Sequence, residues 1–476
     1  MDRTDAEAIY GQGREAVVAV LLRMDEQITR LEKRVEQQDE RIAKLEQKGR
    51  RSSRNSSQPP SADPPSAPPK RGKDPSGKKQ GGQPGHEGKG RPLLPTWAVD
   101  EVVEHWPAGC ECGHVFAAAE LVAAGGPARH QVEELPVMAV RVTEHRCQRV
   151  LCPGCGAKAG AVLPAEAACA HGPRLQAAIV TLSVRNRVSR RDVVELCEQL
   201  FSSRISTGTV EAILARAGDA LIVPCEDLLQ RVRGAAALNM DETGWRLRGK
   251  QRALWGAFTD RHAILQIAPG RHEEHAQSLL GESTAIVTSD RWWAYTHLPV
   301  ARRQVCWSHL QRDFAAHADG LEAEKELGEA GLRICRELFW AWEIFQHTAD
   351  RAELRRRIRL LQRELKPILR QHAGKKARYR HSRGFAKNLL KIWPALWTFA
   401  ARPGVQPTNN HAERALRGSV IARKLSLGSQ SEEGEQRIAR LLSAHTTCRL
   451  QRRSLHAYLI DLLAAHARGQ PAPLLA

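Results

Sequence analysis

The apolar positions of the first 48 residues follow a heptad pattern. Steps of three or four residues separate its members, except where Gln38 replaces one apolar residue. The series is Val17, Leu21, Met24, Ile28, Leu31, Val35, Ile42 and Leu45. Such spacing aligns apolar side chains along one stripe of a helix, as in the seam of a coiled coil, and charges of both signs flank it. We expect residues 1–48 to form a coiled coil that joins copies of the chain; the alternative is an amphipathic helix packed on its own core.

The periodicity disappears between residues 49 and 95. This segment is rich in Ser, Pro, Gly, Lys and Arg and has too few apolar residues to build a core, so we expect a disordered linker. It carries ten Lys and Arg residues against three acidic residues. The sign and density of this charge suit contact with phosphates at least as well as a plain solvated spacer.

Two cysteine pairs follow the linker. One residue separates Cys110 from Cys112, whereas Pro-Gly separates Cys152 from Cys155. Thiolates at the second spacing can bind one tetrahedral Zn²⁺ ion, because the glycine lets backbone amides approach the sulfurs. We favour these four cysteines as the zinc ligands of a small zinc-ribbon-like domain over residues 96–165.

The first pair is the weaker part of this prediction, since a ribbon usually has two residues between its cysteines. His114 and Cys147 are therefore alternatives for the fourth ligand, and a degenerate domain without metal is a further possibility. Residues 131–137 and 139–145 are rich in Val and Glu and are expected to be strands of this domain.

Residues 166–234 carry apolar residues at helical spacing. Helix, turn and helix in succession is the layout of a DNA-binding unit that places its second helix in the major groove. A plain helical bundle has the same pattern. The residues leave both interpretations open.

A different pattern begins at residue 235, with short apolar runs between turns. We predict strands at 236–247, 253–259, 262–268, 285–290 and 303–306, and helices at 273–281 and from residue 308. This order predicts an α/β core with a mixed sheet over residues 235–435, and a helical tail over 436–476.

A helical insertion of about 320–400 interrupts this core. We expect the four tryptophans of the insertion, at 340, 342, 393 and 397, to lie in its hydrophobic core. The basic runs at 355–359 and 375–380 are candidates for contact with DNA.

Three acidic residues stand at the ends of these predicted elements. Asp241 and Asp290 each close a strand-like run, and Glu413 follows a Thr-Asn-Asn turn at the start of a helix. Carboxylate oxygens are the ligands that Mg²⁺ or Mn²⁺ takes, and two such ions support phosphoryl transfer. The three acids therefore predict a two-metal site.

Each acid also has an ordinary explanation. Asp241 could be an exposed strand-end acid, Asp290 a turn former, and Glu413 part of a capping box with Asn410. Glu242 competes with Asp241, because successive strand residues face opposite ways and only one of them can enter the site.

Composition narrows the class of partner. The chain has 476 residues and a formal net charge of +19, so a polyanion is expected to bind, nucleic acid before an acidic membrane. The N-terminus is polar and no apolar run reaches the length of a bilayer span, which predicts a cytoplasmic protein without membrane contact. Eleven cysteines, an odd number, fit reduced thiols with a metal-binding subset.

Together these motifs resemble the DDE transposases of the insertion-sequence sixty-six family. The resemblance rests on Asp-Glu-Thr at 241–243, Asp290 with Tyr295, the Cys-Trp-Ser-His run at 306–309, and Asn-Asn-His-Ala-Glu at 409–413. It extends to the N-terminal half, through the coiled coil, the Ser/Pro tract, the Gly-Gly-Gln-Pro-Gly-His motif at 81–86 and the cysteine domain.

The resemblance implies an RNase H-like fold with Asp241, Asp290 and Glu413 as the catalytic acids. It also implies a transposase that cuts the ends of its own element by hydrolysis and joins the 3′-OH ends to target DNA. Several other residues are expected to contact DNA near the metals: His309, Arg312, Arg414, Arg417, Arg423 and Lys424. His309 has the alternative of a satisfied histidine on a helix face. The rival function is a non-catalytic DNA-binding protein built from the zinc ribbon and coiled coil.

Overall fold

The computed structural model describes residues 3–49, 52, 55, 92–136, 138–376 and 379–476. The chain forms two units. One comprises residues 1–67, 143–197 and 204–476, and the other comprises residues 68–142 and 198–203. Most of the predicted basic linker, 49–95, lies outside the described residues.

A five-stranded mixed sheet forms the centre of the larger unit. Its strands are β3 (Ala237–Leu247), β4 (Lys250–Phe258), β5 (Ala263–Ala268), β6 (Ile286–Ser289) and β7 (Arg303–Val305). They are ordered β5-β4-β3-β6-β7; β3, β4 and β5 are antiparallel, whereas β6 and β7 run parallel to β3. The five strands predicted from the apolar runs are confirmed to within a few residues.

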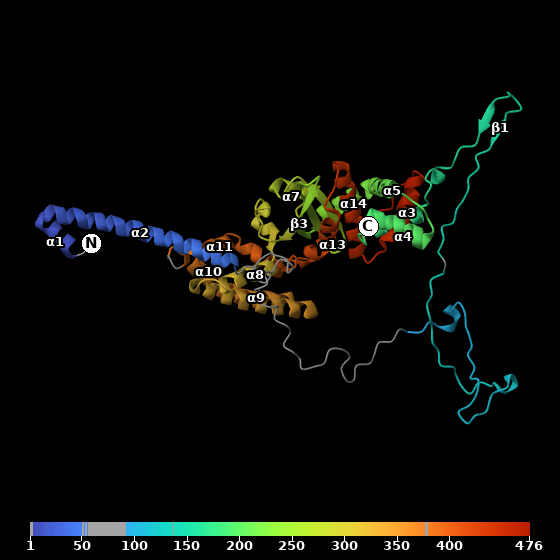
Figure 1. The fold of residues 1–476 in the computed structure, drawn as a ribbon, viewed down its shortest axis with the longest axis horizontal. Coiled ribbons are helices and arrows are strands. Elements are labelled where there is room, and N and C mark those ends of the chain that lie inside the picture. Colours follow the sequence, from blue (N-terminus) through green and yellow to red (C-terminus); the bar gives the residue numbers. More distant parts are fainter. Residues whose placement is uncertain (1–2, 50–51, 53–54, 56–91, 137, 377–378) are drawn as a thin grey trace. The chain divides into compact units, whose positions relative to one another are not determined.

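Helices cover the sheet and its outer strand. Helix α13 (Asn410–Ser426) packs on β3 and β4, and α14 (Glu432–Leu450) packs on β5 (Figure 1). The hydroxyls of Ser443 and Thr447 on α14 accept hydrogen bonds from the backbone amides of Leu265 and Ala263, at 2.9 and 3.0 Å. Because an edge strand exposes unpaired amides, these side chains give β5 the partners that a further strand would have supplied.

The helices before the sheet pack with those after it. They are α3 (Pro173–Val184), α4 (Arg190–Phe201), α5 (Thr207–Ala220) and α6 (Ile222–Arg233). Helix α3 contacts α5 and the last helix, α15 (Leu455–Ala467), while α5 contacts α14. The buried face of α3 is apolar, with Ala177, Ile179 and Val180 fully buried. Helices α3, α5 and α6 thus pack with α14 and α15 in one helical bundle.

Between β7 and α13 the chain runs through helices. They are α8 (Trp307–Ala318), α9 (Glu322–Thr348), α10 (Arg351–His372), α11 (Arg380–Lys391) and α12 (Thr398–Ala401). Helix α7 (Glu273–Leu280) lies earlier in the chain, between β5 and β6. Leu354, Ile358, Leu361, Leu365 and Leu369 of α10 recur every three or four residues and are buried in the core of this insertion. The spacing explains why α10 presents one apolar face.

Three of the four insertion tryptophans fit the prediction, because Trp397 is buried and Trp342 and Trp393 pack against the same core. The prediction is wrong for Trp340, which is 56% exposed. Its ring is covered instead by the guanidinium of Arg357, whose Cζ lies 4.7 Å from the ring centroid.

The N-terminal segment is helical, as the heptads predict. Helix α1 (Arg3–Gly11) is followed by α2 (Arg14–Gly49), and Gly13 between them has a φ of +101° that favours glycine. The apolar stripe of α2 is uncovered: Leu21, Ile28 and Leu31 are 60%, 52% and 58% exposed. No helix in the described residues is long and apolar enough to cross a bilayer.

The cysteine-rich part differs from the prediction. Its strands are β1 (Arg149–Leu151) and β2 (Lys158–Gly160), which form an antiparallel hairpin. The strands predicted at 131–137 and 139–145 are wrong, since none of the described residues of these segments lies in a strand. Val132 and Val142 are 80% and 85% exposed. Val-rich segments form strands when their side chains can pack on a half-buried sheet surface. The described residues offer these two segments no such surface.

The exposed stripe of α2 predicts self-association. Replacing Ile28 and Leu31 by Glu should reduce the assembly mass of the full chain, measured by light scattering without DNA, because charges in the seam oppose coiled-coil packing. Glu32→Lys, on the flank of the stripe, is the control and should leave the mass unchanged. An unchanged mass in the Ile28/Leu31 variant would contradict the coiled coil.

Candidate active site

Two of the predicted acids lie at the same level of neighbouring parallel strands. β3 and β6 pair with Asn239 opposite Thr288. Asp241 and Asp290 each follow two residues later, so the register carries both to the same face and the same height. This is the neighbourhood that the apolar runs predict.

The strand register also separates Asp241 from Glu242. Asp241 is opposite Gly256 of β4, whereas Glu242 is opposite Trp255. Leu416 of α13 packs over Gly256, where an added Cβ would lie 3.3 Å from its Cδ2 atom. Side chains alternate between faces, so Asp241 lies on the face that α13 covers.

Glu242 faces the other side and has a partner there. The hydroxyl of Tyr295 donates a 2.8 Å hydrogen bond to Glu242 Oε2. Tyr295 is fully buried and lies edge-on to Trp255, with the ring centroids 6.1 Å apart. Glu242 is thus tied to the apolar side of the sheet.

Asn409 fixes the start of α13 next to these strands. Its side-chain amide donates to the backbone oxygen of Met240 at 2.7 Å, and its Oδ1 accepts from Asn239 at 3.0 Å. Its backbone N–H donates to Cys306 Sγ at 3.1 Å. The capping-box alternative for Glu413 is wrong, because Asn409 is the N-cap and its side chain bonds to β3 instead of the helix amides.

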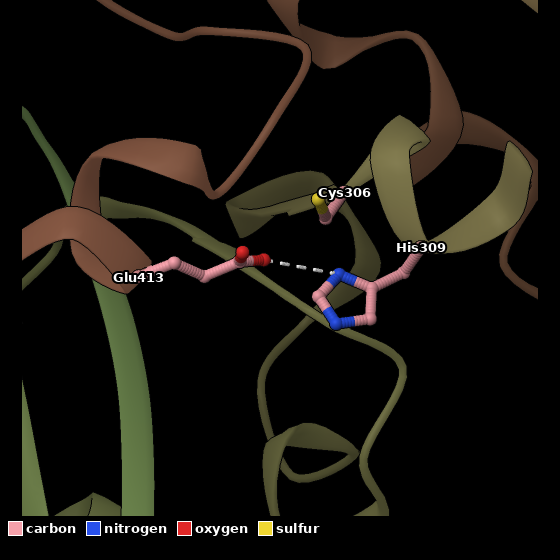
Figure 2. Close-up of side chains that lie close together, drawn as sticks. All are labelled: Cys306, His309 and Glu413. Atoms are coloured by element: carbon pink, nitrogen blue, oxygen red, sulfur yellow. Dashed lines mark ion pairs between the residues drawn. The ribbon is translucent and has the colours of Figure 1, made fainter. Parts of the chain in front are cut away.

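The carboxylate of Glu413, near the start of α13, lies next to side chains near the start of α8. Its Oε1 lies 3.6 Å from His309 Nδ1 and 3.8 Å from Arg312 Nη2. Figure 2 shows the carboxylate directed at the imidazole, with the Cys306 sulfur beside it. Ligand atoms of Cys306, His309 and Glu413 lie within 4.8 Å of one another. His309 and Arg312 therefore lie next to Glu413, and their contact with DNA stays a prediction.

The acids repel one another in a partly buried site. Burial, followed by the charges of Glu242, Asp290 and Glu413, raises the pKa of Asp241 well above its ordinary value. Burial and the charge of Asp290 raise the pKa of Glu242 to about 7. Burial also raises the pKa of Asp290, although Arg271, Arg291 and Arg303 oppose the rise. Removing this mutual repulsion requires protons or a cation.

The donor set fits hard divalent cations. Glu413 Oε1 and His309 Nδ1 are buried and have no hydrogen-bond partner in the described part of the chain. Asp290 uses Oδ1 to accept a 2.8 Å bond from the Trp292 amide, a turn role that occupies only one of its oxygens. Cys306 keeps its proton because burial raises its pKa to about 11. Oxygens of Asp241, Asp290 and Glu413 are thus suited to Mg²⁺ or Mn²⁺.

His309 stands beside these oxygens as a neutral imidazole. Burial, then the charges of Arg312 and Arg291, lowers the pKa of His309 to about 4. The alternative of a satisfied histidine on a helix face is wrong for Nδ1, which has no hydrogen-bond partner among the described residues.

The remaining predicted DNA contacts lie along α13. Arg414, Arg417 and Lys424 are exposed. Arg423 is half-buried and donates a 2.8 Å hydrogen bond to the backbone oxygen of Gly244 on β3. Burial, together with the charges of Arg271 and Arg246, lowers the pKa of Arg423, which shows that these cations gather near the strand that carries Asp241.

Sequence reasoning gave no role to Asn409, Tyr295, Arg271 or Arg303. Asn409 and Tyr295 are parts of recognisable motifs, but only the fold shows that they hold α13 and Glu242. Arg303 is buried beside Asp290 and Tyr295, and Arg271 acts from the loop before α7. No local pattern in the sequence marks either arginine.

The two cysteine turns resemble each other. Cys110 donates its amide to His114 O and accepts from the Gly113 amide, while Cys152 donates to Ala157 O and accepts from the Gly156 amide. The second turn is one residue longer, which matches its extra residue between cysteines.

Backbone amides approach the sulfurs in both turns. Amides of Cys112 and of Gly154 are the main causes that lower the pKa of Cys110 and of Cys152, respectively. The two turns belong to different units. Shared binding of one zinc ion by Cys110, Cys112, Cys152 and Cys155 stays a prediction.

Comparison with known proteins identifies the class as transposase. A family model described as transposase IS66 family matches residues 169–437, which is more than half of the chain. The chain therefore belongs to the IS66 family of transposases. A model described as a family of unknown function (DUF6444) matches residues 12–92. An uncharacterized protein of Sinorhizobium fredii, y4hP, is 26% identical over 419 residues, covering 79% of this chain and 74% of the relative.

The raised pKa of Glu242 predicts a stability that falls with pH. The unfolded carboxyl titrates near about 4.3, so between that value and about 7 the folded protein holds more protons and loses stability as pH rises. Glu242→Gln should stabilise the metal-free protein by at most about 4 kcal/mol at about pH 8, and by much less at about pH 5.

Thermal melting in a chelator at both pH values measures this difference. The exposed Glu282 provides the control, since Glu282→Gln should change the melting temperature little at either pH. An equal gain from Glu242→Gln at both pH values would contradict the raised pKa.

The cysteine turns predict about one zinc ion per chain in the reduced full-length protein, measured by metal analysis. Cys152→Ser should remove the zinc, because tetrahedral sites need all four ligands, and Cys147→Ser should retain it. If Cys147→Ser loses the zinc and Cys112→Ser retains it, Cys147 and not Cys112 is a zinc ligand. If the reduced protein binds no zinc when zinc is supplied, the zinc-ribbon prediction is wrong.

Proposed function

We propose that the chain is a DDE transposase that cuts DNA at the ends of its element by metal-dependent hydrolysis and joins the 3′-OH ends to target DNA. The observation that supports this proposal is the shared register of Asp241 and Asp290 at β3 and β6, together with the charge that Glu413 of α13 exerts on Asp241. Membership of the IS66 family supports the same activity.

The sheet supports an RNase H-like core. Three antiparallel strands are followed by two strands parallel to the first, and helices lie between and after them. This order agrees with the fold that the sequence motifs imply. The helical insertion lies between β7 and α13, so it leaves the strands that carry Asp241 and Asp290 continuous.

The acids would hold two Mg²⁺ or Mn²⁺ ions. Such ions activate water or a 3′-OH, and they stabilise the oxygen that leaves phosphorus. Asp241 and Asp290 would supply oxygens from the sheet, and Glu413 from α13. Asn409 and its bonds to β3 and α8 would keep Glu413 in place while DNA enters.

His309 and Arg312 are suited to the phosphate itself. A neutral imidazole can donate one hydrogen bond to a phosphate oxygen, and Arg312 adds a charged fork beside it. Arg414, Arg417, Arg423 and Lys424 would hold the flanking backbone. The cysteine turns would help to recognise the element ends, and the N-terminal coiled coil would pair protomers.

A further group of cations lies on the other side of α13. Arg187 is 3.8 Å from the position of a Cβ on Gly418 of that helix. Arg185, Arg187 and Arg449 are close enough to His445 that, after burial, their charges lower its pKa to about 4. None of the three forms an ion pair with a described acidic residue, whereas nearby Arg190 pairs with Glu211 at 2.6 Å. Unpaired cations of this kind suit a DNA backbone.

Strand cleavage tests the proposal. Asp241→Asn, Asp290→Asn and Glu413→Gln should each lower cleavage of a labelled element-end duplex at least about a hundredfold, because each removes charge that holds the metals. The three changes should be non-additive, since the acids act as one unit. DNA affinity should persist in each variant.

Glu242→Gln is the matched control and should retain much of the cleavage, because Glu242 lies on the opposite face from α13. An Asp290→Asn protein that cuts at nearly the parent rate would overturn the assignment. If the parent protein binds the element-end duplex but does not cut it in the presence of Mg²⁺ or Mn²⁺, the rival function of a non-catalytic DNA-binding protein is favoured.

A further inference from the structure

Two tryptophans stand exposed directly after Asp290. Trp292 is 37% exposed and Trp293 is 47% exposed, whereas the next two residues, Ala294 and Tyr295, are fully buried. The buried side chains of Ala294 and Tyr295 therefore anchor this short segment, and the two large aromatic rings that precede them remain at the surface. Exposed aromatic pairs of this kind mark binding surfaces more often than chance exposure does.

The rings are held in place. The Trp292 amide donates to Asp290 Oδ1 at 2.8 Å, and its indole Nε1 donates to Arg271 O at 3.4 Å. The Trp293 ring lies 6.0 Å from the Trp292 ring and 5.9 Å from the His272 ring, centroid to centroid. A platform fixed in this way loses little conformational freedom when a flat ligand stacks on it.

We infer that Trp292 and Trp293 form a stacking platform for an unpaired nucleobase next to the phosphodiester that is cut. The inference rests on the proposed function, because the phosphodiester is placed by Asp290. The platform is joined to that carboxylate by a hydrogen bond two residues along the chain. A base attached to the bound phosphate would therefore lie within reach of the rings.

The chemistry around the rings favours a nucleotide over an apolar protein segment. Arg271 is exposed, and its charge opposes the rise in the pKa of both Glu242 and Asp290, which places its guanidinium near the acids. A cation beside an aromatic face matches a phosphate beside a base. Stacking requires an open base face, so the base must leave the duplex stack.

Trp340 provides a comparison within the same chain. It is 56% exposed, but the Arg357 guanidinium already lies over its ring, and it sits on α9 of the insertion. Exposure alone would assign it the same role. The hydrogen bond from Trp292 to Asp290, one of the proposed metal ligands, distinguishes the Trp292–Trp293 pair from Trp340.

A binding experiment tests the platform without requiring cleavage. The probe is a short duplex with one mismatched 2-aminopurine, compared with the same duplex fully paired, and the protein is the full chain with Asp241→Asn. We expect the mismatched duplex to bind more tightly and its 2-aminopurine fluorescence to be quenched on stacking. Trp292→Ala with Trp293→Ala should lower affinity for the mismatched duplex by roughly tenfold and abolish the quenching.

Affinity for the paired duplex should stay unchanged in that variant, and Trp340→Ala should match the parent on both probes. Trp292→Phe with Trp293→Phe, which keeps two aromatic faces and the fold of the segment, should retain most of the preference. Equal quenching and equal preference in the alanine variant would overturn the platform while leaving DNA binding intact. A parent that binds neither duplex would overturn the proposed function as well.

Discussion

The site depends on the hydrogen bonds of one buried residue, Asn409. It joins β3 through Met240 and Asn239, and it joins the start of α8 through Cys306, although these partners are 169, 170 and 103 residues away in the chain. Glu413 lies one helical turn beyond Asn409, so this junction sets where its carboxylate meets Asp241. Because Asn409 is fully buried, an apolar residue there would leave several polar groups without partners, each at a cost of about 1–3 kcal/mol.

Local patterns predicted the sheet well, because apolar runs and turns are properties of a few consecutive residues. The strands that carry Asp241 and Asp290 were predictable in this sense. The choice between Asp241 and Glu242 was not, since alternation says that they face opposite ways but only the packing of α13 over Gly256 says which face matters. The predicted strands around Val132 and Val142 failed for the converse reason: their composition is strand-like, but no partner strand or packed surface exists for them in the described residues.

Electrostatics explains how a chain with a net charge of +19 tolerates a cluster of acids. Burial and mutual repulsion raise the pKa values of Asp241, Glu242 and Asp290, so the cluster is costly when fully ionised and empty of cations. Arg271 and Arg303 reduce this cost in part. The same acids would repel a DNA phosphate, and divalent cations held between the carboxylates and the phosphate would remove both repulsions together.

The pairing of cations, more than their number, indicates where DNA is expected to lie. The basic run at 355–359 looks like a DNA contact in the sequence, but Arg355 donates to backbone oxygens at the end of α12, and Arg356 and Arg357 bond to Glu353. Cations whose donors are already satisfied gain little from a phosphate. Near α13, Arg185 and Arg187 form no ion pair with an acidic residue among the described ones, and their charges act on His445. The proposed DNA path along α13, toward Asp290 and its two tryptophans, therefore rests on charges without acidic partners and not on the density of basic residues.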